Sequence, residues 1–307
     1  MGNWNILFQT EFLEYIPCTA ALSQTCIAFN GVVPNTSNNY MLTENTESWC
    51  QTLPVYERFD RTVASVLNRC PEDIPVSKIY RICVKYHNVG LLQYYEARYG
   101  VVPTVELMNC AAKYGVLSIM RYLRERDDPC PWNAWACASA ARNDHLHILH
   151  YLRERDDPCP WNERACASAA GNGHLRILRY LRERDDPCPW DTWACAEAAR
   201  NDHLRILRYL RERDDPCPWN ERACVSAARN DHLRILRYLR ERDDPCPWDA
   251  WACTEAARND HLDILRYLRE RDDPCPWDRT TYEYAILANR IEIINYLKEH
   301  NAPTGDE

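Results

Sequence analysis

The sequence lacks the features that would direct the chain into or across a membrane. No apolar run approaches the roughly 18 residues that a membrane-spanning helix requires. Residues 1–10 lack the basic start and the continuous apolar stretch of a secretory signal. Ile6 stands where an N-myristoylation motif starting at Gly2 needs Ser or Thr. We therefore expect an intracellular protein of the cytoplasm or nucleus with no membrane partner.

The chain also lacks an excess of positive charge. Its formal net charge is -8 and its pI is about 5.7, so the molecule as a whole repels nucleic acid and anionic membranes. Arginines gather locally, at Arg205, Arg208, Arg211 and Arg213, but the block 191–219 holds five arginines against six acidic residues. Such mixed charge is typical of a solvated, ion-paired face. We expect no nucleic-acid partner.

The 17 cysteines do not have the pattern of a metal or disulfide framework. Their number is odd, and most recur at one fixed spacing among apolar residues, which favours small, reduced, buried side chains. Cys130, Cys137 and His145 recur together in each copy, but no CxxC pair accompanies them, so zinc is weakly indicated. A catalytic site needs a unique constellation, and these copies are nearly identical. We expect no cofactor, no metal and no enzymatic activity.

An internal repeat determines the predicted architecture. The motif Pro-Cys-Pro-Trp recurs with a period of 29 residues, and a second period of 58 lies over it. The 29-residue motif places tryptophans at Trp132, Trp161, Trp190, Trp219, Trp248 and Trp277. The copies are close to identical, which indicates duplication of a two-repeat block.

Each unit is predicted to contain two helices, as the copy 220–248 illustrates. Asn220 can cap a first helix whose small residues, 223–228, allow close packing. The second helix, 232–242, has apolar residues at Leu233, Leu236 and Leu239 and arginines on its solvent face, including Arg234, Arg237 and Arg240. The sequence Asp-Asp-Pro at 243–245 ends it.

Helix pairs this short bury an apolar face only by stacking on one another. The sequence therefore predicts an all-α solenoid of about eight helix pairs over residues 76–307, most of whose copies are near-perfect. The six motif tryptophans are expected to form a ladder along it, as core or as a binding stripe. The last copy, 279–300, is expected to close the array with a polar end at Lys298, Glu299 and His300.

The unit resembles the ankyrin repeat. The turn at 169–175, Ala-Ala-Gly-Asn-Gly-His-Leu, is similar to that family's turn between helices, and 177–181 is similar to its second helix. The family's Thr-Pro-Leu-His signature is replaced by Arg-Ala-Cys-Ala at 164–167, and the hairpin between repeats is cut short. Short Cys-Pro-Trp-Asp/Asn repeats of giant viruses, algae and oomycetes are similar, which would imply a host-cell location if the chain is viral. Four copies carry Asp where the family has Gly, a substitution that a left-handed turn tolerates: Asp144, Asp202, Asp231 and Asp260.

Residues 1–57 form a separate predicted module, joined to the repeats by a helix or linker at 58–75. The stretches 11–17 and 21–30 resemble the later part of an F-box, and 48–53 resembles the Trp-containing segment that follows it. The resemblance implies docking on the Skp subunit of a cullin-type ubiquitin ligase by apolar helix-in-groove contacts. These helices could instead cap the open end of the solenoid. The implied Skp-binding anchors are Leu13, Ile16, Pro17, Leu22 and Phe29.

Positions that vary among otherwise identical copies indicate where a partner protein would bind. With the hairpins shortened, the first helices should line the concave surface of the solenoid. One variable position alternates Trp and Arg, residue types favoured at binding hot spots, although this variation can also be without function. The main hypothesis is a monomeric substrate-recruiting ligase adaptor, and the alternative is a plain ankyrin scaffold or competitor. The candidate partner-binding residues are Trp135, Arg164, Trp193, Arg222, Trp251, Glu197 and Glu255.

Overall fold

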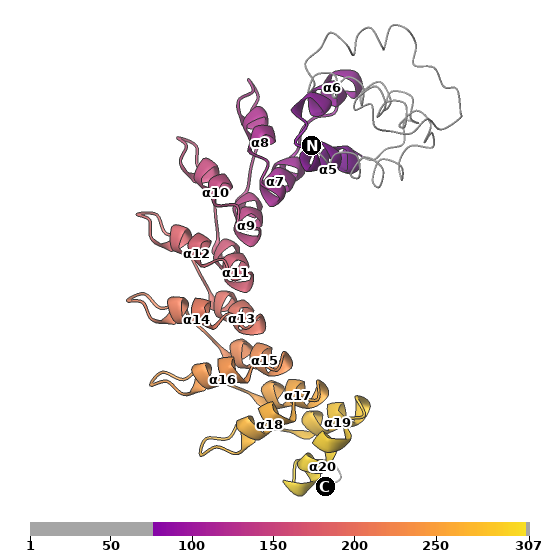
Figure 1. The fold of residues 1–307 in the computed structure, drawn as a ribbon, viewed down its shortest axis with the longest axis vertical. Coiled ribbons are helices and arrows are strands. Elements are labelled where there is room, and N and C mark those ends of the chain that lie inside the picture. Colours follow the sequence, from indigo (N-terminus) through magenta and orange to yellow (C-terminus); the bar gives the residue numbers. More distant parts are fainter. Residues whose placement is uncertain (1–75, 305–307) are drawn as a thin grey trace, which may run out of the picture. The chain divides into compact units, whose positions relative to one another are not determined.

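The computed structural model describes residues 76–304, and every regular element among them is an α-helix (Figure 1). Within these described residues, sixteen helices follow one another as eight pairs, so the predicted all-α helical-repeat architecture is confirmed. The chain divides into two compact units, Met1–Pro131 and Trp132–Glu307, which are described separately. None of the helices within 76–304 is long and apolar enough to cross a bilayer.

The described part of the first unit contains the two degenerate pairs. Their core includes Leu107, Met108, Ile119 and Leu123, all fully buried. Gly100 and Gly115 end two of the helices in the left-handed conformation, where the absence of a Cβ removes the steric penalty. The helices are α5 (Val76–Lys85), α6 (Val89–Tyr99), α7 (Val105–Tyr114) and α8 (Leu117–Arg124).

The second unit contains six pairs in a regular stack. Each first helix packs on the first helices before and after it, as α13 does on α11 and α15. The first helices are α9 (Ala134–Arg142), α11 (Glu163–Gly171), α13 (Thr192–Arg200), α15 (Glu221–Arg229), α17 (Ala250–Arg258) and α19 (Arg279–Leu287). The second helices are α10 (Leu146–Arg153), α12 (Leu175–Arg182), α14 (Leu204–Arg211), α16 (Leu233–Arg240), α18 (Leu262–Arg269) and α20 (Ile291–Glu299).

Small residues account for the close packing of the first helices. In α13 the buried side chains are four alanines and Cys195, whereas its partner α14 buries Ile206, Leu207 and Leu210. The Asn or Asp that precedes each first helix from α9 to α17 accepts the N–H of the second helical residue, as Asp191 does from Trp193 at 3.1 Å, and Asp278 accepts that of the third residue of α19. Such a cap stabilises the helix by about 1 kcal/mol. The second helices end two residues earlier than predicted, at Arg240 rather than residue 242 in α16.

The turn within each pair requires a left-handed residue. Asp144, Asp202, Asp231 and Asp260 have φ between 57° and 69°, and Gly173 has φ 76° at the same position. The predicted tolerance of Asp at this position is therefore confirmed. The following histidine secures the turn to the repeat before it, since His174 Nε2 lies 3.0 Å from the carbonyl oxygen of Arg142.

The Pro-Cys-Pro-Trp segment connects three elements through one cysteine. The proline on each side disfavours helix, so Cys188 is extended. Its N–H donates to the carbonyl oxygen of Leu181 at 2.8 Å, and its thiol donates to that of Asn162, the cap of the preceding first helix, at 3.2 Å. The same two bonds recur around Cys217, Cys246 and Cys275, which are all fully buried.

Candidate functional site

An arginine that was predicted to face solvent is part of the repeat core. Arg182, the last residue of α12, donates to the carbonyl oxygen of Cys188 at 2.5 Å and to Asp215 of the next repeat at 2.5 Å. Its guanidinium carbon lies 3.9 Å from the centre of the Trp190 ring, and its side chain is only 9% exposed. The same contacts recur at Arg240 with Trp248, so the expectation that Arg240 lies on the solvent face is wrong.

These contacts also decide the role of the motif tryptophans. Trp161, Trp190, Trp219, Trp248 and Trp277 each lie under an arginine, with 3.8–4.0 Å between the guanidinium carbon and the ring centre. They are half-buried rather than fully enclosed. They therefore form a column of Arg–Trp stacks that holds the connecting segments on the second helices.

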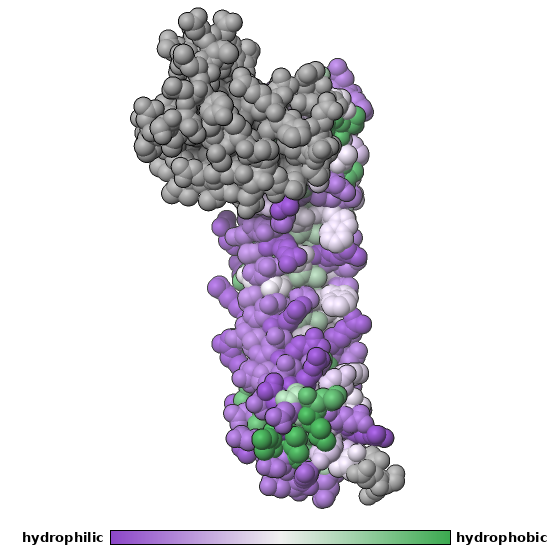
Figure 2. All heavy atoms as spheres, turned by 90° about the vertical axis from the view of Figure 1, so that its right-hand side faces the viewer, coloured by the Kyte–Doolittle hydropathy of each residue, from purple (hydrophilic) through white to green (hydrophobic). Residues whose placement is uncertain are grey.

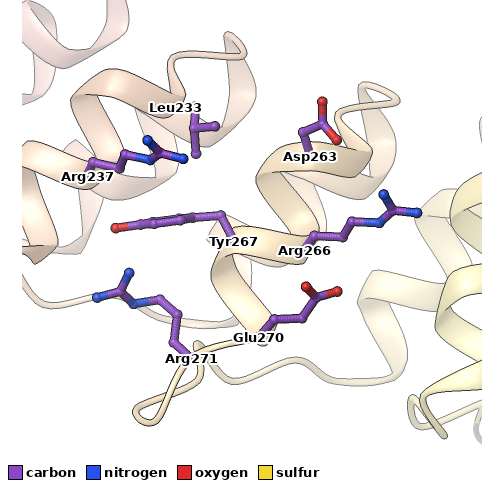
Figure 3. Close-up of a pocket in the computed structure, with 7 residues that line it drawn as sticks. All are labelled: Leu233, Arg237, Asp263, Arg266, Tyr267, Glu270 and Arg271. Carbon is purple, nitrogen blue, oxygen red and sulfur yellow. The ribbon is translucent and has the colours of Figure 1, made fainter.

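A second cluster joins consecutive second helices. The Tyr209 hydroxyl donates to Glu183 of the preceding repeat at 3.1 Å, and Arg213 lies 3.4 Å from the same carboxylate and 4.8 Å over the tyrosine ring. Burial raises the pKa of Tyr209 to about 12. A shallow depression of about 430 Å³ between α16 and α18 includes the tyrosine and arginine of this cluster two repeats further on, with Tyr267 crossing it beside Arg271 (Figure 3). The residues that line it hold consecutive second helices together.

Three exposed tryptophans lie on the first helices, away from the contacts made by the second helices. Trp135, Trp193 and Trp251 are 53%, 48% and 50% exposed, although tryptophan is usually well buried. They occupy the second residue of α9, α13 and α17, and Arg164 and Arg222 occupy that position in α11 and α15 between them. We call these five residues the Trp–Arg ladder.

Within the ladder each arginine lies on the tryptophan of the preceding repeat. The guanidinium carbon of Arg164 is 4.5 Å from the centre of the Trp135 ring, and that of Arg222 is 4.6 Å from Trp193. Trp251, which has no arginine after it, meets Tyr284 edge-on at 6.4 Å. Cation–π contact holds Trp135 and Trp193 in place, while about half of each indole stays exposed. The first-helix side is shown face-on in Figure 2.

The two candidate glutamates lie in different environments. Glu255 is 4% exposed and accepts two bonds from Arg229 of the preceding repeat, at 2.7 and 2.9 Å, so it is committed to the stack. Glu197 is 30% exposed and faces Gly171, with Arg200 of its own helix 3.8 Å away. Glu197 therefore adjoins the ladder, whereas Glu255 does not contact solvent as a partner-binding residue would. The predicted Skp-binding anchors Leu13, Ile16, Pro17, Leu22 and Phe29 lie outside the described residues.

The described residues do not bring metal ligands together. No group of three His, Cys, Asp or Glu side chains within 76–304 is placed to hold an ion. A hydrogen bond with the Cys166 thiol, together with burial, raises the pKa of Cys188 well above its ordinary value, so this thiol stays protonated. A protonated, buried thiol is a poor nucleophile and a poor metal ligand.

Comparison with known proteins places the chain among helical-repeat folds and no further. No family model and no curated protein matches the chain. Solved structures that match it include the pentatricopeptide repeat protein PPR10 in complex with an 18-nt psaJ RNA element, and a triple Cys-to-Ser variant of the same complex. Both are 11% identical with a TM-score of 0.31 and cover 84% of this chain, which spans 49% of their length.

These matches require a correction to the sequence analysis. The expectation of no nucleic-acid partner is wrong, because helical-repeat chains that match this one are bound to RNA. At this identity and TM-score the likeness concerns the fold and says nothing about which molecule this chain binds. The chain is a helical-repeat protein.

Proposed function

We propose that the protein is a non-enzymatic scaffold that binds an extended segment of a partner protein along the Trp–Arg ladder. The single observation that supports this proposal most strongly is the half-exposure of three tryptophans at one repeated position. Burying indole rings is strongly favourable, and tryptophan and arginine dominate the binding energy of protein interfaces. Nothing in the stack of helices requires these rings to be large, since Arg164 and Arg222 occupy the same position.

The spacing of the ladder favours an extended partner. Neighbouring helices pack at roughly 8–10 Å, so tryptophans two repeats apart are separated by about 20 Å. An extended peptide advances about 3.3 Å per residue, so roughly six of its residues span the distance between two rings. A linear segment with apolar residues at about this interval fits the ladder.

A protein segment suits the local charges better than RNA does. Glu163 and Glu221 directly precede the two ladder arginines, and Glu197 lies in the helix between them. A phosphate backbone carries one charge per nucleotide and would meet these carboxylates all along its path. A peptide can place acidic residues against Arg164 and Arg222 alone. RNA is accordingly the alternative that the experiment must test.

The plain scaffold is favoured over a ligase adaptor. Neither the family models nor the curated proteins support an F-box-like module, and its anchors lie outside the described residues. The ankyrin-like interpretation of the repeat rests on the turn at 169–175 and the second-helix pattern at 177–181, and no family model supports it. The scaffold proposal depends on neither resemblance.

The experiment selects ligands with the purified full chain. A random peptide display library and a random 20-nucleotide RNA pool are enriched in parallel on the wild type and on the triple variant Trp135→Ala, Trp193→Ala, Trp251→Ala. Each hot-spot tryptophan contributes about 2 kcal/mol or more, so peptide affinity should fall at least about 30-fold per residue removed. Arg234→Ala, on the second-helix side, is the matched control and should bind normally. Ladder-dependent enrichment of RNA but not of peptides, or of neither, would refute the proposal.

A further inference from the structure

The C-terminal pair of the array exposes an apolar face. Ile286 and Leu287 at the end of α19 and Ile291 at the start of α20 are 49%, 79% and 65% exposed. Figure 2 shows a hydrophobic patch near this end of an otherwise hydrophilic side. Repeat arrays normally end in a polar cap. The expected polar end at Lys298, Glu299 and His300 is present on α20, but it does not cover these three residues.

Upstream copies show what these three positions do within the stack. Ala257, which precedes Ile286 by one period, is fully buried. Arg229, which corresponds to Leu287, contacts Glu255 of the following repeat. Leu233, which corresponds to Ile291, lines the depression shared with residues of α18 (Figure 3). The exposed patch is therefore the stacking surface of the last pair.

The composition of this surface does not suit another copy of the repeat. The residue opposite Arg229 is 26 positions further on, and in the five regular copies this position holds serine or glutamate, whereas the last pair has Tyr284. A further regular repeat would therefore place a hydroxyl or a carboxylate against Leu287. Relative to upstream copies, alanine has become isoleucine and arginine or glycine has become leucine. The surface is matched to an apolar surface like itself.

We propose that two copies of this chain associate end to end through this face, with Ile286, Leu287 and Ile291 of one copy packed on the same residues of the other. A two-fold axis makes such an isologous contact self-complementary and closes the assembly at a dimer. The rim carries both signs, with Glu292 and Lys298 exposed on α20, so a two-fold contact does not require like charges to meet. A contact made by one helix pair per partner falls in the class of small, weak interfaces, so the dimer should depend on protein concentration.

Sedimentation equilibrium of the full chain between 5 and 500 µM tests the proposal. The wild type should shift from monomer to dimer over this range. Leu287→Arg introduces the arginine that the equivalent position 229 carries, and it should raise the dissociation constant of the dimer at least tenfold. Because Leu287 is 79% exposed, its substitution leaves the helical signal and melting temperature unchanged. Trp193→Ala on the ladder is the matched control and should dimerise normally, which also separates this proposal from the ladder.

A charge-swap experiment tests the two-fold arrangement. Leu287→Arg and Leu287→Asp should each be monomeric alone, and an equimolar mixture should recover the dimer because position 287 then meets an opposite charge across the axis. A wild type that stays monomeric at 500 µM, a dimer insensitive to Leu287→Arg, or a mixture that stays monomeric would each overturn the proposal.

Discussion

Gly171→Arg should stabilise the protein by supplying a missing ion pair. At the same position one repeat block later, Arg229 forms a two-pronged bond with Glu255. Glu197 lies in the corresponding place opposite Gly171, and its nearest cation is Arg200 at 3.8 Å. The array thus contains both halves of a natural comparison, one glutamate with its arginine and one without it.

The magnitude follows from three contributions. Replacing glycine within a helix contributes up to about 0.5–1 kcal/mol, and less at the last residue, where Gly171 lies. A pair whose glutamate is 30% exposed adds about 0.3–1 kcal/mol. A Cβ at position 171 would lie 3.0 Å from the Cβ of Glu197, so the neighbour must shift by a few tenths of an ångström. The α15–α17 interface accommodates the same side chains, and the net gain expected is about 1 kcal/mol.

Urea unfolding followed by circular dichroism measures this gain, and a double-mutant cycle isolates the pair. Glu197→Gln should remove the ion-pair share of the gain but not the helix-propensity share. The reverse change, Arg229→Gly, should cost more, about 2–4 kcal/mol, because it strands a carboxylate that is only 4% exposed. Equal and opposite effects of the two substitutions, or a loss of stability in Gly171→Arg, would show that the environments of Glu197 and Glu255 have been read wrongly.

Three further predictions concern the stack itself. Arg182→Met should lower the free energy of unfolding by about 2–4 kcal/mol because it removes two charged hydrogen bonds and the Trp190 stack. Arg182→Lys should have an intermediate stability, since an ammonium cannot form the planar fork of a guanidinium. A wild-type urea midpoint for Arg182→Met would contradict this prediction. Asp231→Val should cost about 1–2 kcal/mol at φ 60° while Asp231→Gly is nearly neutral, measured by thermal melting, and equal losses would contradict the left-handed requirement. Stability should fall as pH rises above about 9–10, because buried thiols such as Cys188 and tyrosines such as Tyr180 stay protonated in the folded chain while the same groups ionise in the unfolded chain. Burial raises the pKa of Tyr180 to about 12. Unfolding measured across alkaline pH should show this decline, and a flat profile to pH 12 would contradict it.

The repeat made the architecture predictable from sequence. A period of 29 with capping residues, small first helices and a leucine-rich second helix led to the helix pairs, to the caps at residues such as Asn220 and to the left-handed aspartates. These are local properties, and each copy repeats the evidence. The early end of α16 at Arg240 was missed because the Arg240 guanidinium donates to the carbonyl of Cys246 in the segment that follows, a contact that the helical spacing does not reveal.

The contacts between repeats could not be predicted in the same way. Arg240 follows the spacing of a solvent-facing arginine, and only its position over Trp248, which is eight residues ahead in a folded-back segment, shows that it is buried. The difference between Glu197 and Glu255 depends on the residue 26 positions earlier, Gly171 or Arg229. The sequence carries no signal for this pairing, since the earlier position is Arg before Ser, Glu or Tyr and the later one is Glu after either Gly or Arg. The pairing becomes visible only in the register of the stack.

The pattern of identity among the copies separates stability from binding. The arginine, tyrosine, glutamate, cysteine and tryptophan that hold one repeat on the next are the same in the successive copies from α10 to α18, and each contacts a neighbouring element. The ladder position holds Trp in three repeats and Arg in two, with no change in the helix that carries it. A position that can be exchanged without disturbing the stack, and that still carries a large exposed side chain in each of these repeats, can change to suit a binding partner. Under the proposed function, the ladder is therefore the part of the repeat on which binding can change without a loss of folding.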